Sequence, residues 1–100
     1  MPKMSIVVPH RLSPDEALGR IKGLLADLKT QHQGQFSDLK EQWSDHRGEF
    51  SAKAMGFNVS GWVEVRPTEV TLEGDLPFAA MPFKGRIESL VRERAETLLA

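Results

Sequence analysis

The spacing of apolar residues changes twice along this chain, once near Gly34 and again near Pro82. Before Gly34 and after Pro82, apolar side chains recur every three or four residues, a spacing typical of amphipathic helices. Between these positions they recur at every second residue, which is typical of strands with one buried face. The sequence therefore predicts helices on either side of a set of antiparallel strands.

The first helix has a well-marked start. Ser13 is expected at the N-cap, Pro14 at the first helical position, and Glu16 at the third, where it completes a capping box. A short strand at residues 4–8 precedes this helix and ends at Pro9. The helix is predicted to end at Gly34, and its apolar stripe consists of Ala17, Leu18, Ile21, Leu24, Leu25 and Leu28.

Four strands are predicted after Gly34, because apolar and polar residues alternate in four segments separated by turn-forming residues. Gly48 is expected to take a positive φ in the first of these turns. A helix is the alternative for residues 36–44, since Leu39 and Trp43 also fit a helical spacing. The predicted strands are 39–44, 50–55, 59–66 and 70–76.

The last helix is predicted to run from Pro82 or Phe83 to Leu99. The 100 residues are expected to form a single α+β domain, because a chain of this length has little room for a second core. One antiparallel sheet carries two helices packed on one face, in the order β-α-β-β-β-β-α. The inner stripe of the last helix is predicted to consist of Phe83, Ile87, Leu90, Val91 and Leu98. The predicted core includes Leu24, Leu28, Trp43, Val63, Leu72, Ile87 and Leu90.

The composition excludes several classes of protein. The 13 Lys and Arg residues are interleaved with 14 Asp and Glu, which argues against a nucleic-acid partner, because such proteins carry a basic face. The absence of cysteine excludes disulfides, thiolate catalysis and Cys-based metal centres. No segment has the roughly 20 apolar residues of a transmembrane span, and the N-terminal apolar run is too short for a signal peptide. We therefore expect a cytoplasmic protein.

No catalytic or cofactor-binding pattern is visible in the sequence. The three histidines, His10, His32 and His46, lack the spacing of metal ligands and are expected to be solvated at the surface. Glu41 alternates onto the apolar face, where a carboxylate could act as a base, but exposure at the sheet edge is the simpler interpretation. The sequence thus predicts no enzyme, no metal site and no cofactor.

Two sets of apolar residues are candidates for contact with a partner. Trp62 lies on the polar face of its strand, where it would anchor a partner or pack on the stem of Lys53 or Arg66. The loop before the last helix carries large apolar side chains outside any regular period. This loop either closes the core of the small domain or forms a contact for a partner. Its candidate residues are Phe78, Met81 and Phe83.

Several motifs are distributed over nearly the whole chain. They are Pro9-His10 after the opening strand, the Leu12–Leu28 helix, Leu39-x-x-x-Trp43, Phe50, Gly61-x-Val63-x-Val65, Leu76-Pro77 and Phe83-Lys84-Gly85-Arg86-Ile87-Glu88. With these motifs the chain resembles the polyhydroxyalkanoic acid system family, a group of small bacterial proteins, and the run from Lys84 to Glu88 is the most specific part. The resemblance implies an association with storage of poly(3-hydroxyalkanoate), a carbon-reserve polyester. It implies no catalytic residues.

We therefore expect a non-enzymatic accessory protein, cytoplasmic or granule-associated, that binds the polyester granule surface or a protein partner. The alternative is a helix-grip-like carrier of an acyl or other lipid-like ligand, which would need an internal cavity of several hundred Å³. A homodimer is a further candidate assembly, because the edge strands of a small sheet readily pair.

Overall fold

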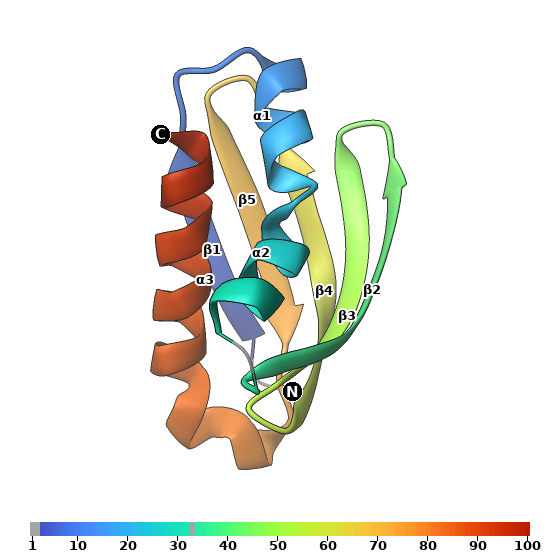
Figure 1. Cartoon of the computed structure of the whole chain (residues 1–100), viewed down its shortest axis with the longest axis vertical. Helices are drawn as coiled ribbons and strands as arrows, with labels where there is room; N and C mark the ends of the chain where they lie inside the picture. Colours follow the sequence, from blue (N-terminus) through green and yellow to red (C-terminus); the bar gives the residue numbers. More distant parts are fainter. Residues whose placement is uncertain (1–2, 33) are drawn as a thin grey trace.

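The computed structural model describes residues 3–32 and 34–100 of the chain (Figure 1). It confirms the α+β class and the predicted order of elements, with the first helical region divided in two and a 3₁₀ helix, η1, before the last helix. The elements are β1 (Lys3–Pro9), α1 (Pro14–Ile21), α2 (Leu24–Gln31), β2 (Phe36–Ser44), β3 (Arg47–Ala54), β4 (Phe57–Val65), β5 (Glu69–Asp75), η1 (Phe78–Phe83) and α3 (Lys84–Leu99).

A five-stranded antiparallel sheet forms one layer of the molecule, with the strand order β1-β5-β4-β3-β2. The strands β2 to β5 follow one another as a meander, and β1 pairs with β5, so that Ile6 lies opposite Leu72. All the helices cover the same face of this sheet (Figure 1). Residues 36–44 belong to β2, so the strand interpretation of this segment is correct. A register shift between Ser37 and Lys40 interrupts the pairing of β2 with β3.

The first helical region is divided at Lys22 and Gly23. Its start is as predicted, since the Ser13 Oγ accepts a hydrogen bond of 3.1 Å from the Glu16 N–H. The amide N–H of Gly23 bonds to the Arg20 carbonyl at 3.1 Å, and Gly23 has φ −89° and ψ 0°, outside the helical region. A glycine lowers the cost of such a break, because it already weakens a helix by about 1 kcal/mol relative to alanine. The division lets α1 contact β4 while α2 contacts β2.

The core lies between the helices and the inner face of the sheet. Leu24, Leu28, Val63, Leu72 and Ile87 are buried, as predicted. For Trp43 and Leu90 the prediction of full burial is wrong, because both side chains are only partly buried at the margin of the core.

The register of α3 differs from the predicted stripe. Its buried positions recur at every fourth residue and are Ile87, Val91, Ala95 and Leu99. Leu90 and Leu98 pack beside this row and are partly buried, whereas Phe83 is exposed. The stripe is thus rotated toward Ala95, a small residue that does not belong to the predicted set.

The expectation that Gly48 takes a positive φ in the β2–β3 turn is wrong. The positive φ in this turn belongs to Asp45, at 59°, and Gly48 is a buried residue of β3. A Cβ atom at Gly48 would lie 2.7 Å from the indole ring of Trp43, which sits opposite it in the strand pair. Gly48 therefore provides room for the indole and is not required for the turn.

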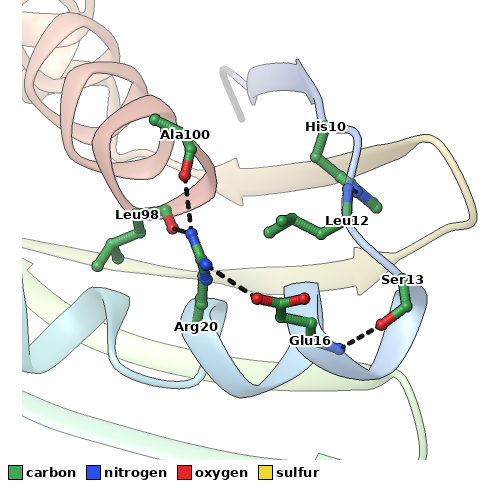
Figure 2. A network of polar contacts seen from close by, with 7 residues as sticks. All are labelled: His10, Leu12, Ser13, Glu16, Arg20, Leu98 and Ala100. Atoms are coloured by element: carbon green, nitrogen blue, oxygen red, sulfur yellow. Dashed lines mark hydrogen bonds and ion pairs between the residues drawn. The ribbon is translucent and has the colours of Figure 1, made fainter.

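Polar contacts hold the C-terminal end of α3 against α1. The Arg20 Nη1 donates to the carbonyl oxygens of Leu98, at 3.2 Å, and Ala100, at 2.8 Å, while its Nη2 donates to Glu16 Oε1 at 2.9 Å (Figure 2). One guanidinium thus satisfies carbonyl groups that the end of a helix leaves without intrahelical partners.

A second arginine joins α3 to α2. The Arg94 guanidinium forms two hydrogen bonds with the Asp27 carboxylate, at 2.5 Å from Nε and 3.2 Å from Nη2, and both side chains are only 19% exposed. The hydrogen bond to Asp27 raises the pKa of the Arg94 guanidinium. Because α3 is fixed to both α1 and α2, the η1 segment at its start has a defined position.

Candidate functional site

The η1 segment, between β5 and α3, has a buried side and an exposed side. The side chains of Leu76, just before it, and of Ala80, within it, are completely buried. The Ala80 N–H also bonds to the Pro77 carbonyl at 2.9 Å. These contacts attach η1 to the core, so the rest of the segment is presented from a fixed backbone.

Three large apolar side chains project from the other side of η1. Phe78 is 74% exposed, Met81 45% and Phe83 42%. Elsewhere among the described residues, only Val7 is a large hydrophobic residue of comparable exposure, at 43%. The interpretation that this loop closes the core is thus correct for Ala80, whereas Phe78, Met81 and Phe83 remain outside the core, and contact with a partner stays a prediction for these three. We call these three residues the η1 surface.

The β3–β4 turn lies beside the η1 surface. The rings of Phe57 and Phe83 are tilted against each other with their centroids 5.6 Å apart, a distance typical of favourable aromatic pairs. Met55 and Gly56 make this turn with positive φ values of 52° and 84°. The turn and η1 together form one end of the molecule (Figure 1).

The start of α3 adds positive charge next to the η1 surface. Arg86 is exposed, and the Lys84 Nζ lies 3.7 Å from the Glu88 Oε1 one turn further on. The first turn of α3 contains no acidic residue. Helices usually carry acidic residues at this position, because the N-terminal end of the helix dipole is positive. Lys84 and Arg86 therefore slightly disfavour this helix terminus, so helix stability does not account for their position.

Trp62 is not part of this end of the molecule. It lies on the outer face of β4, opposite Glu49 and Glu73 in the neighbouring strands. Phe57 faces the inner side about 17 Å away along the same strand. The guanidinium carbon of Arg47 sits 4.4 Å from the centre of the Trp62 ring, in a cation–π contact. The packing partner is thus Arg47, and the expected partners Lys53 and Arg66 were wrong.

The three histidines have different surroundings. His10 is buried, with its Nε2 2.9 Å from the Arg66 carbonyl and its Nδ1 accepting a hydrogen bond of 3.1 Å from the Leu12 N–H. The expectation of a solvated histidine is therefore wrong for His10, which joins the end of β1 to the β4–β5 turn. His46 contacts Asp15 and Asp45, and His32 is partly buried. Over residues 3–32 and 34–100, no cluster of three His, Asp or Glu side chains could hold a metal ion.

The spaces between the helices and the sheet are small. One, bordered by Phe50 and Ile87, has a volume of about 30 Å³, and the other, bordered by Trp43 and Glu41, about 20 Å³. An acyl carrier needs a cavity roughly ten times larger. A wider hollow of about 650 Å³ lies at the β2 bulge between Asp38 and Ser60, but it is open to solvent, and most of the residues around it are polar or charged. Glu41 itself is exposed at the sheet edge, as the simpler interpretation had it.

The sequence model of the family described as "Putative polyhydroxyalkanoic acid system protein" matches residues 4–99. The chain belongs to this family. The resemblance carried by the sequence motifs is thus confirmed from the opening strand to the last residues of α3. Neither a reaction nor a ligand-binding residue follows from the family description of this polyhydroxyalkanoic acid system protein.

Comparison of this family member with solved structures gives a distant match. The crystal structure of TTHA0849 from Thermus thermophilus is 14% identical over 98% of this chain and 92% of that chain, with a TM-score of 0.40. A likeness at this level supports no conclusion about fold or function. No curated protein matches the chain in sequence. In the part of the chain that the structure describes, no helix has both the length and the apolar character to cross a membrane.

Proposed function

We propose that this polyhydroxyalkanoic acid system family protein is a non-enzymatic accessory protein that binds the surface of polyester granules through the η1 surface. A protein partner on the granule is the second form of the same proposal. The observation that carries it is the exposure of Phe78, Met81 and Phe83 on a segment whose other side is anchored in the core by Leu76 and Ala80.

Exposed apolar side chains on an anchored segment are suited to binding. Apolar surface gains about 25 cal/mol for each Å² that a partner removes from water, and a side chain already in the core cannot contribute in this way. Phe78 is the most exposed large hydrophobic residue described, and two further exposed apolar side chains lie on the same short segment, a grouping that is uncommon on a protein surface. The small volumes beneath the helices favour a binding protein over the carrier alternative.

The double substitution Phe78→Ser and Met81→Ser tests the proposal in cells. We expect the altered protein to shift from the granule fraction to the cytosol when cells that store polyester are fractionated. The free energy of unfolding should change by no more than about 0.5 kcal/mol, because both side chains are exposed. The measurement is the distribution of the protein between the two fractions, compared with cells grown without polyester storage.

Val7→Ser is the control, since Val7 is about as exposed as Met81 but lies on β1, away from η1. It should leave the granule fraction unchanged. Wild-type protein that stays in the cytosol during polyester storage would refute granule association. A double variant that unfolds would show instead that Phe78 and Met81 support the core.

A further inference from the structure

An exposed cation, Arg86, lies three residues after Phe83 at the end of the molecule that carries the η1 surface, although the whole chain has a net charge of −1. Two segments meet there, residues 52–59 around the β3–β4 turn and residues 76–87, because Phe57 packs against Phe83. Together these segments contain Lys53, Lys84 and Arg86 and no aspartate or glutamate. Arg86 is exposed, while Lys53 and Lys84 pair with acidic side chains outside the segments, at 3.6 and 3.7 Å.

The shape of this end limits what it can bind. The molecule measures 38 × 26 × 22 Å along its principal axes, and η1 lies at one end of the longest axis (Figure 1). Each partner of a stable protein complex buries about 800 Å² of surface. The end face, bounded by the two shorter extents, offers less area than the long sides of the molecule. A lipid layer needs less area, because it requires only a few projecting apolar side chains and flanking cations.

We infer that the η1 surface and Arg86 bind an anionic lipid layer, with Phe78 and Met81 entering the apolar boundary and Arg86 contacting the negatively charged head groups. This inference rests on the proposed function and specifies the chemistry of the surface bound at the same site. The cations at the start of α3 then have an explanation. They disfavour the helix terminus slightly but attract the surface that the neighbouring apolar side chains enter.

Binding of the purified 100-residue chain to lipid vesicles tests this inference. One set of vesicles contains phosphatidylcholine alone, and the other contains phosphatidylcholine and phosphatidylglycerol in equal parts. We expect flotation of wild-type protein with the phosphatidylglycerol vesicles only, and weaker binding as salt is added, because salt screens exposed charges. Equal binding to both sets, or binding to neither, would overturn the inference.

Two pairs of variants separate the contributions of charge and apolar contact. Arg86→Gln should weaken binding to the anionic vesicles about fivefold, the factor that corresponds to about 1 kcal/mol for one cation near such a surface. Arg11→Gln removes the same charge from the exposed β1–α1 loop, which lies at the opposite end of the molecule, and should have no effect (Figure 1). Phe78→Ser should weaken binding about tenfold or more, whereas Val7→Ser should not. Equal effects within either pair would overturn the inference.

The vesicle and cell experiments distinguish failure of the lipid inference from failure of the proposed function. Protein that enters the granule fraction but binds no vesicle would overturn the lipid inference and leave the proposed function intact, with polyester or a granule protein as the surface. If protease treatment of isolated granules then abolishes rebinding, the partner is a protein. Protein that binds anionic vesicles but never enters the granule fraction would refute the granule role and support the lipid inference alone.

Discussion

Gly61→Ala is expected to prevent folding, or to lower the free energy of unfolding by about 3 kcal/mol or more. A Cβ atom at Gly61 would lie 1.8 Å from the Glu73 carbonyl oxygen and 2.7 Å from the Gly74 Cα. These are backbone atoms of β5, so no flexible side chain can move aside to relieve the clash. The strand pair in the middle of the sheet would have to separate. Urea denaturation of the purified variant, followed by circular dichroism, measures the loss.

Gly19→Ala is the matched control for this change. Gly19 lies in α1, and apart from its chain neighbours and the backbone of its own helix nothing lies within 4 Å of a Cβ atom placed there. Alanine should therefore raise the free energy of unfolding by up to about 1 kcal/mol, as expected for an exposed helix interior. A Gly61→Ala variant as stable as the wild type would show that β4 and β5 do not approach as closely as described.

Ile87→Ala is expected to cost about 2–5 kcal/mol of stability, the range for truncation of a buried aliphatic side chain. Ile87 is 1% exposed and belongs to the buried row of α3. Leu90→Ala should cost clearly less, because Leu90 is only partly buried beside that row. Thermal or urea unfolding of the two variants gives the difference directly.

The comparison between these two positions tests the register of α3. The stripe predicted from the sequence places both Ile87 and Leu90 in the core, and it would require similar losses. The observed register requires a larger loss at Ile87. If Leu90→Ala were the more damaging change, the helix would be rotated toward the predicted stripe.

The sequence did not show why glycine is needed at three positions on the inner face of the sheet. At Gly61 the cause is the approach of the β5 backbone, and at Gly48 it is the Trp43 indole. At Gly74, the Met4 Cε would lie 3.2 Å from an added Cβ. Each cause comes from a strand or side chain that pairing brings near, so no local pattern could reveal it.

The sequence marked the η1 segment as a candidate site, but it did not show which of its residues are buried and which are exposed. An apolar run outside any regular period marked residues 78–83 as unusual. Which members are buried depends on the space left between β5 and α3, and that space is filled by Ala80. Phe78 and Met81 face outward because a small side chain takes the inner position. The separation of Trp62 from this surface likewise follows from the face on which β4 places it.

Local patterns were sufficient to predict the class, the order of elements and the helix start at Ser13, because side-chain period and capping depend on residues close together in the chain. The family also follows from the sequence, through motifs that lie within the matched residues 4–99. The break at Gly23, the rotation of α3 toward Ala95, the burial of His10 and the exposure of the η1 surface became visible in the folded molecule alone. These features depend on the space that remains between segments far apart in the chain. A periodic pattern determines the width of an apolar stripe, but it does not determine which part of the stripe faces the core.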